Sequence, residues 1–489
     1  MTLERGAPLR WALLALAVVA LVAVGLRYVN PGGDSRYALA WGGLLRNGYT
    51  PDFSDPSLPA KHPLDLGTTT ALAVLGPQGA VDGYAVLALL WAALMLYAAY
   101  RLARAVAGPE TGSAGMAAGL IAAIVLLTHP RVLTAVTNAY HDVSYAALVL
   151  LAGALAVEEP VRKWRPALIL LALAGLQRPE AWGLALLYGG WLLLRAERSP
   201  LQVVPLVLAA PVLWVLVDLV LTGEPFQTLD QLRAGDTDPG AGVGGALPAT
   251  VAALDPFPIG RYWDALETGI VGIAGLPLTA ISVAAAVWAF ASPAAAPASP
   301  GGSGAARRAR LLVAGILAGL TLFTVIVAAG LPFSNRFLLA VGVGTAAMGA
   351  SMFAVWRGRA GMVALAATGI AIGALMPADL SREGDVLDKQ RDRREEANAL
   401  ASLAGQPAIR RTTRRCVRVR FASTAGGGHA DRGRAIVAQR LVQDPASIRI
   451  RRRIRLSEGT GFFYYAKDIR APRGASSLER PPWGFTAQC

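Results

Sequence analysis

The sequence predicts a polytopic α-helical membrane protein with about eleven transmembrane helices and a small extracytoplasmic α/β domain at its C-terminal end. Three observations support this expectation. Of the 489 residues, 54% are hydrophobic and only 16% are charged, which is too apolar for an ordinary soluble protein. Apolar runs near the roughly 20 residues that span a bilayer recur along the chain. From residue 378 onward, polar and arginine-rich segments replace these runs.

Each transmembrane helix is expected where an apolar run approaches the spanning length. The expected spans are residues 11–27, 82–100, 114–128, 141–157, 166–177, 181–195, 201–221, 269–290, 311–331, 337–356 and 360–377. The first is not a cleaved signal peptide, because no small-x-small cleavage site stands out and many spans follow it. The span at 166–177 is too short to cross at about 1.5 Å per residue, so the segment GLQRPEAW is a candidate re-entrant turn.

The distribution of cations orients these spans. Clusters occur at Arg5 and Arg10, Arg101 and Arg104, Arg162, Lys163 and Arg165, Arg195 and Arg198, Arg307, Arg308 and Arg310, and Arg357 and Arg359. By the positive-inside rule, the loops that carry them are cytoplasmic. The N-terminus is therefore expected in the cytoplasm, and residues 28–81, 129–140, 222–268 and 378–489 are expected to face outward.

Residues 1–377 are expected to form the membrane body, and residues 378–489 a separate domain. Within the body, the Ala/Pro/Gly/Ser-rich segment 292–310 predicts a flexible cytoplasmic linker. In the domain, the pattern predicts a helix from Ser381, as N-cap, to Leu403, a strand at 416–423, a helix at 431–442 and a strand at 448–456. GGGH (426–429) is either a phosphate-binding turn or a plain loop, since it matches no complete fingerprint.

The net charge of +14 does not indicate a nucleic-acid partner, because much of the excess lies in the outward-facing segment 378–489. Anionic lipid headgroups or polyanionic cell-surface glycans are better candidates, and a merely solvated arginine-rich face is the alternative. The chain has two cysteines, Cys416 and Cys489, both in this segment. Their shared oxidising compartment is compatible with one disulfide, although spacing alone does not establish its geometry.

Two acids stand at the expected starts of helices on the outer side. Tyr37, Trp41, Leu44 and Leu45 are spaced as in an amphipathic helix, whose tryptophan would suit the lipid headgroup zone, and Asp34 precedes them. Asp142 opens the fourth span, with His141 before it as a candidate ligand or base. Each acid is either a helix N-cap, a role that Asp favours, or a catalytic carboxylate such as a general base.

Three cations lie near the same membrane boundary: Lys61, Arg178 and Arg336. Singly, each is explained by snorkelling. Together with the acids they indicate an outward-opening polar cavity that holds a lipid-linked phosphate, and Asp218 is a further candidate for its lining. The chain contains no Walker loop, Rossmann fingerprint, Cys-x-x-Cys pair or His-Glu-x-x-His helix, which argues against an ATPase or a zinc protease.

These features resemble the GT-C membrane glycosyltransferases, especially their polyprenyl-phosphate-sugar-dependent mannosyl- and arabinosyltransferase-like branch. The shared features are an acid after the first span, an amphipathic helix behind it, the segment KHPL (61–64), an Asp opening the fourth span and the turn RPE (178–180). The resemblance implies that Asp34 and Asp142 are the catalytic acids and that Lys61 contacts the lipid phosphate. It also makes His62, His141, Arg178, Glu180 and Arg336 substrate-binding candidates.

The chain departs from that pattern at Ala60, where some members carry a metal-binding glutamate. His62 is the candidate substitute, so no cofactor is certain and a divalent metal is an open alternative. The reaction expected from the resemblance is inverting transfer of a sugar from a polyprenyl-phosphate donor to a glycan, lipid or protein acceptor of the cell envelope. The alternatives are a transporter or flippase of a lipid-linked glycan, which paired half-sequences would indicate, and a non-catalytic membrane anchor.

Overall fold

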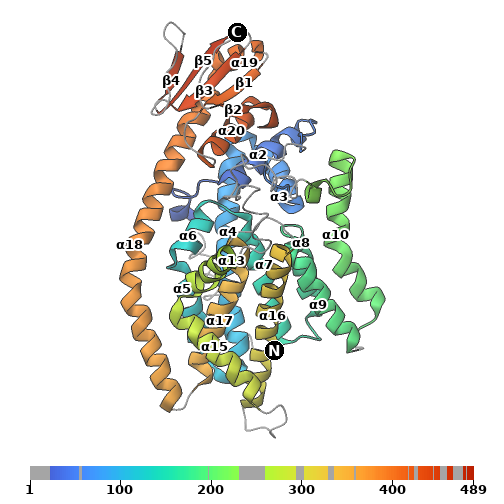
Figure 1. Ribbon diagram of the computed structural model, residues 1–489, viewed down its shortest axis with the longest axis vertical. Helices are drawn as coiled ribbons and strands as arrows, with labels where there is room; N and C mark the ends of the chain where they lie inside the picture. The colour runs from blue at the N-terminus through green and yellow to red at the C-terminus, as the bar shows by residue number, and fades with distance from the viewer. Residues whose placement is uncertain are drawn as a thin grey trace, which may run out of the picture.

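The computed structural model describes residues 22–53, 58–195, 198–230, 259–292, 302–328, 335–356, 359–416, 418–422, 428–443, 445–451, 460–465, 477–480 and 482–489. Helices form a tall body with a small sheet at one end (Figure 1). The helices are α2 (Gly33–Arg46), α3 (Pro63–Leu72), η1 (Ala73–Leu75), α4 (Gly76–Ala107), η2 (Pro109–Thr111), α5 (Ser113–Leu127), α6 (Pro130–Thr137), α7 (His141–Glu158), α8 (Trp164–Gly175), α9 (Glu180–Leu194), α10 (Pro200–Thr222), α13 (Ile259–Leu266), η3 (Glu267–Val271), α14 (Gly272–Ala274), α15 (Leu276–Ala291), α16 (Gly302–Ala328), η4 (Asn335–Leu338), α17 (Leu339–Val355), α18 (Arg359–Ala404), α19 (Pro407–Arg415), α20 (Gly428–Leu441) and η5 (Pro445–Ser447).

Among the described residues, four helical segments are long and apolar enough to cross a membrane: 63–107, 141–158, 200–222 and 304–328. Two further pairs pass the same test together but are bent at a break, α5 with α6 by 68° and 262–274 with α15 by 98°. Most of the expected first span, 11–27, lies outside the described residues. The others coincide with helices, although α8, α9 and α17 are shorter than a full crossing.

The centre of the body is packed from small residues. Helix α17 is buried on nearly every side, and its core partners lie on α4, α5, α7 and α15. A Cβ on Gly349 would lie 2.5 Å from the Leu278 carbonyl oxygen, so a glycine is needed for α17 to approach α15 this closely. Such small-residue contacts are how helices associate in lipid, where apolar burial provides no driving force.

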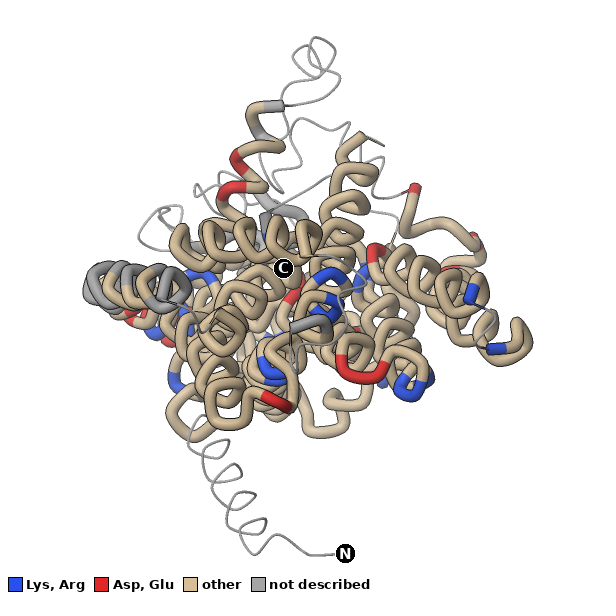
Figure 2. Tube along the Cα trace, turned by 90° about the horizontal axis from the view of Figure 1, so that it is seen from below, with Lys and Arg blue, Asp and Glu red and all other residues tan. Residues whose placement is uncertain are grey.

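Apolar side chains point outward along the helices at the periphery of the body. On α10, Leu201, Leu208, Leu213, Leu216 and Val220 are exposed. Seen from the end opposite the sheet, most positions along the helices are uncharged (Figure 2). A soluble monomer rarely exposes so much contiguous apolar surface, whereas lipid chains would cover it, so the surface supports a location in a membrane.

Two expectations for the second half of the body are wrong. The span expected at 269–290 is not one helix, because Gly275 (φ 76°) separates α14 from α15. That backbone conformation is one that glycine adopts without strain. The linker expected at 292–310 is shorter than predicted, because α16 already begins at Gly302 and Arg310 donates to the Ala289 carbonyl at 2.7 Å. Residues 293–301 lie outside the described residues.

A single long helix joins the body to the sheet. Helix α18 has 46 residues, or about 69 Å at 1.5 Å per residue, and runs along the side of the body up to the sheet (Figure 1). The prediction that a new helix starts at Ser381 is therefore wrong, and the boundary expected at 377/378 falls inside α18. No glycine stands between Leu375 and Arg382 to end the helix, and Pro377 is accommodated within it.

The C-terminal segment forms a five-stranded sheet in the order β2-β1-β3-β5-β4. Its strands are β1 (Arg418–Ala422), β2 (Arg449–Arg451), β3 (Thr460–Tyr465), β4 (Ser477–Arg480) and β5 (Trp483–Gln488). Strand β1 pairs in parallel with β2 and β3, whereas β5 pairs antiparallel with β3 and β4. The strand expected at 416–423 and the helix expected at 431–442 are present as β1 and α20. Residues 452–456 and the first two residues of GGGH lie outside the described residues, and Gly428 begins α20.

The sheet packs on the end of α18 and on α19 and α20. Leu400, Ile409, Phe421, Ile436 and Phe463 belong to one buried cluster. Cys416 and Cys489 form a disulfide with their Cα atoms 5.0 Å apart. The bond ties Cys489, which follows β5, to Cys416 at the end of α19, so it joins the sheet to its helices.

Helix α20 rests on α2, and this contact corrects the position expected for Trp41. Tyr37, Trp41, Phe53 and Leu66 form a buried cluster that includes Ala435 of α20. Trp41 is therefore covered by the C-terminal segment and does not lie in a headgroup zone. Helix α2 lies between the body and the sheet (Figure 1).

Candidate functional site

All eight residues singled out from the sequence lie at helix ends or in connections. Asp34 is in the first turn of α2, Lys61 and His62 precede α3, and His141 and Asp142 begin α7. Arg178 and Glu180 lie where α8 gives way to α9, and Arg336 lies in η4. These elements pack against one another at one end of the helical body, so residues far apart in sequence meet there.

Backbone hydrogen bonds bring the two acids to the same place. Asn30 donates to the Thr137 carbonyl and Gly32 to the Asn138 carbonyl, both at 2.7 Å. A Cβ on Gly32 would lie 2.7 Å from the Tyr140 ring, so only glycine permits this approach. Ala139 has φ 51°, a conformation that costs energy in a residue with a side chain. The connection before α2 is thus fastened to the connection before α7.

Each acid is paired with an arginine from another element. Asp142 pairs with Arg178, with side chains 1% and 5% exposed. Asp34 pairs with Arg336 at 3.2 Å, with side chains 22% and 32% exposed. Burial alone would lower the pKa of Arg336, but the carboxylates of Asp142 and Asp34 together raise it. The Arg336 guanidinium therefore interacts electrostatically with both acids, and the two ion pairs form a single charged cluster.

Neither acid caps its helix. The N-cap of α2 is Gly32 and that of α7 is Tyr140, and neither cap has a side-chain hydrogen bond. Asp34 and Asp142 lie inside the first turn instead, where a negative charge is favoured by the helix dipole. The capping alternative is therefore wrong for both, and their partners are the cations of the cluster.

A pair of histidines lies against the cluster. The rings of His62 and His141 are 4.0 Å apart, and the indole of Trp214 meets His62 edge-on at 6.0 Å. Burial, together with the charge of Arg178, lowers the pKa of His62 to about 3. His62 is therefore neutral at ordinary pH.

Several buried polar atoms at this site have no hydrogen-bond partner among the described residues. They are Nδ1 of His62, Nδ1 of His141, Oδ2 of Asp142, Oε1 of Gln177 and Oε2 of Glu180. Leaving a buried polar group unsatisfied costs about 1–3 kcal/mol. Their concentration around one ion pair indicates a site that is completed by a ligand.

The described residues do not assemble an obvious metal centre. No group of three or more His, Cys, Asp or Glu side chains among them is arranged to hold a metal ion. His62 and His141 face each other, but Asp142 is engaged by Arg178.

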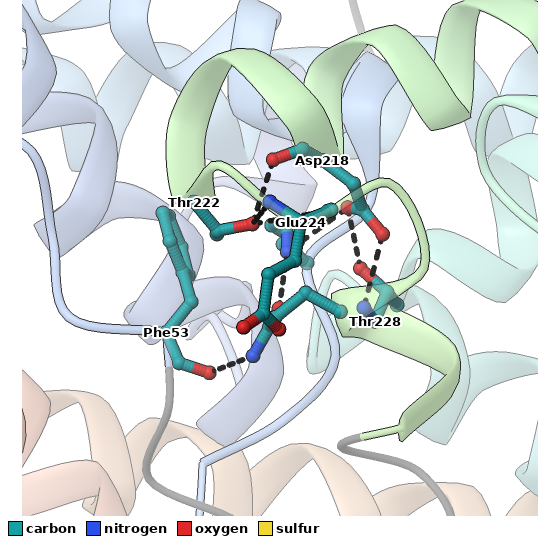
Figure 3. Close-up of polar contacts among 7 residues, drawn as sticks. Phe53, Asp218, Thr222, Glu224 and Thr228 are labelled. Carbon is teal, nitrogen blue, oxygen red and sulfur yellow. Dashed lines mark hydrogen bonds and ion pairs between the residues drawn. The ribbon is translucent and has the colours of Figure 1, made fainter.

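Lys61 has a different environment from the two arginines. Its Nζ lies 2.9 Å from Asp218 Oδ1 and donates to Gln227 Oε1 at 2.6 Å, with both ion-pair side chains fully buried. Asp218 also accepts from the backbone and hydroxyl of Thr228, and the Phe53 carbonyl accepts from Gln227 (Figure 3). Burial lowers the pKa of Lys61, although Asp218 opposes this shift. The charge of Lys61 is thus already compensated within the protein.

An apolar cavity of about 420 Å³ lies within the body next to the cluster. Its walls come mainly from α7, α9, α16 and α17, with Val149, Leu184, Leu322 and Val341 among the lining residues. Glu180 is its charged lining residue, and Glu180 lies 3.4 Å from Arg178. The cavity therefore ends at the charged cluster.

The structure adds residues that the sequence patterns did not single out. Asp65 in α3 is buried, accepts from the Tyr84 hydroxyl at 3.0 Å and interacts electrostatically with Asp34 and Asp142. The Tyr140 ring lies 4.6 Å below the Arg336 guanidinium. A sequence signal existed for Asp65, since an acid in an apolar helix is a functional candidate by default. No sequence signal existed for Tyr140, because its contact is with Arg336, which is 196 positions away.

No protein-family model and no curated protein matches the chain. The chain is similar to two crystal structures of ArnT from Cupriavidus metallidurans. The structure bound to undecaprenyl phosphate is 13% identical, with 99% of each chain covered and a TM-score of 0.44. The apo structure is 15% identical, with 99% of this chain and 98% of that chain covered and a TM-score of 0.37. At this identity and TM-score, neither structure assigns a residue role to this chain.

Proposed function

We propose that this protein is an inverting glycosyltransferase that moves a sugar from a polyprenyl-phosphate donor to a hydroxyl group of a cell-envelope acceptor. The observation that carries the proposal is the apolar cavity ending at the Asp142–Arg178–Glu180 cluster. A ligand that fits both parts has a long apolar tail and an anionic head. The tail would occupy the cavity between α7, α9, α16 and α17, and Arg178 and Arg336 would face the phosphate.

Asp34 is the proposed base because it is the more accessible of the two acids. The acceptor oxygen attacks the anomeric carbon from the face opposite the phosphate, while an Asp34 oxygen takes the acceptor proton. The bond between the anomeric carbon and the phosphate oxygen breaks, and polyprenyl phosphate leaves with the electron pair. Arg178 and Arg336 stabilise its charge, and Asp142 holds Arg178 in place. We assign Lys61 a structural role, because Asp218 and Gln227 already occupy its ammonium group.

The test uses purified full-length protein in lipid nanodiscs with a panel of polyprenyl-phosphate-linked pentoses and hexoses and a cell-envelope glycan extract. We expect acceptor-dependent release of polyprenyl phosphate from one donor, with inverted configuration in the product. Movement of the intact donor across a bilayer without cleavage would contradict the proposal and favour a transporter. Absence of both cleavage and donor binding would favour a membrane anchor.

The proposed site must also face outward, as the cationic clusters predict. The chain's two cysteines are joined in the disulfide, so one introduced cysteine is the single free thiol. Arg411 on α19 and Arg162 before α8 are both exposed and serve as a matched pair. In intact cells, a membrane-impermeant maleimide should label Arg411→Cys and not Arg162→Cys. The reverse pattern would place the site on the cytoplasmic side. That result would overturn the proposed reaction, which uses a lipid-linked donor and no nucleotide at the outer face of the membrane.

A further inference from the structure

The helix that carries the proposed base is held by a buried arginine of the C-terminal segment. Arg434 of α20 donates from Nε to the Tyr37 hydroxyl of α2 at 2.7 Å. Its guanidinium also lies 5.3 Å from the centre of the Tyr37 ring. Both residues are almost fully buried, at 4% and 2% exposed. A hydrogen bond and a cation–π contact at one desolvated place make a well-defined contact between the two helices.

Tyr37 follows Asp34 by three residues, so the two side chains lie on neighbouring positions of one face of α2. At its start, α2 is fastened by Ser35, whose hydroxyl donates to the Ala139 carbonyl at 2.8 Å. Arg434 supplies a second point of attachment one turn further along. Asp34 is next to the first attachment and one turn before the second, and its own pair with Arg336 is partly exposed.

The position of Arg434 is in turn set by the sheet. A Cβ on the preceding residue, Gly433, would lie 2.2 Å from the Phe421 ring of β1. Helix α20 can therefore lie this close to the strand only because residue 433 is glycine. Strand β1 therefore contacts α20, and α20 contacts α2 at Tyr37, one turn from the Asp34 carboxylate.

Ala435 of α20 also packs against α2, but two polar contacts of α20 go to another part of the body. Gln439 donates to the Pro77 carbonyl at 3.2 Å and Arg440 donates to Gln78. Both acceptors lie at the start of α4, and both contacts are less buried than the Arg434–Tyr37 contact. Gln439 is thus a control that tests attachment of α20 without touching α2.

We propose that Arg434 is a positioning residue for Asp34, so that the C-terminal segment sets the geometry of the catalytic base in the body. This inference rests on the proposed function. A small displacement of a reacting group costs about 10²-fold in rate, and Arg434 is one of the contacts that prevent such a displacement of α2. Removal of the Arg434 side chain should slow the chemical step. The donor phosphate site should be unchanged, because its residues lie on other elements.

The experiment compares Arg434→Ala, Arg434→Lys, Tyr37→Phe and Gln439→Ala in nanodiscs. We expect Arg434→Ala and Tyr37→Phe to lower kcat by roughly 10- to 100-fold with donor KM within about twofold of wild type. Arg434→Lys should restore much of the lost rate, because an ammonium group can also face the ring and the hydroxyl. Gln439→Ala should behave as wild type. Equal losses in Gln439→Ala, or an unchanged kcat in Arg434→Ala, would overturn the inference.

A second measurement does not depend on catalysis. Amide hydrogen exchange in α2 should speed up in Arg434→Ala and Tyr37→Phe but not in Gln439→Ala, because only the first two remove the hydrogen bond from Arg434 to Tyr37. Unchanged exchange in all three variants would overturn the inference even if no donor is ever identified. If wild-type protein cleaves no donor while α2 exchange responds as expected, the proposed function fails and the attachment of α2 by Arg434 stands.

Discussion

Two ion pairs beside the α2–α3 contact are built in opposite ways. Lys61 and Asp218 are fully buried, and Gln227 and Thr228 satisfy the pair with further hydrogen bonds. Asp34 and Arg336 are partly open, and the cluster around them keeps buried polar atoms without partners among the described residues. A saturated pair has no capacity left for a ligand, whereas a partly exposed pair beside unsatisfied polar atoms can still bind one. We infer that the first pair maintains the fold and that the second performs chemistry.

The largest effect on stability is expected at the buried pair. Lys61→Met leaves Asp218 charged and unpaired in the interior, which should lower the free energy of unfolding by about 3–5 kcal/mol. Asp218→Asn in the same chain removes the stranded charge and should recover part of the loss. Denaturant unfolding of the two single variants and the double variant measures this coupling. A loss confined to donor KM, with stability unchanged, would instead assign Lys61 to the donor phosphate.

The next effect concerns the disulfide, which closes the C-terminal fold far from both pairs. Cys416→Ser should lower the stability of this part by about 2–4 kcal/mol. Below its unfolding temperature the variant should keep wild-type kcat, because α20 still rests on α2. Thermal unfolding followed by activity at a lower temperature tests both statements. A fall in kcat in the fully folded variant would mean that the bond acts on the site directly.

A smaller effect is expected from His62. Its pKa is about 3 in the folded chain and about 6.5 when unfolded, so between these values only the unfolded state binds the proton. Stability should therefore fall as the pH drops below about 6.5, by about 1.4 kcal/mol per pH unit from this group. His62→Gln should remove that part of the slope. Identical slopes for wild type and variant between pH 6.5 and 5 would show that His62 is not buried neutral.

The contrast between the pairs also explains which features were predictable from sequence. Most of the expected spans coincide with helical segments because each is a continuous apolar run, as in α10 and α16. Asp34 and Asp142 were singled out because acids at membrane boundaries are rare. The N-cap alternative is wrong for both, because the start of a helix depends on where the backbone turns. The partners of Lys61 and Tyr37, Asp218 and Arg434, lie 157 and 397 positions away, and no local pattern predicts such a contact.

The most direct test of the account is Asp34→Asn, because the proposed base should matter to chemistry and hardly at all to stability. Asn keeps the size of the side chain, and Asp34 does not cap α2, so the change removes little more than a half-open ion pair worth up to about 1 kcal/mol. We predict an unfolding midpoint close to wild type, with release of polyprenyl phosphate slowed by roughly 10²- to 10⁴-fold. A folded variant that turns over at nearly the wild-type rate would contradict the central claim and move the search for the base to Asp142.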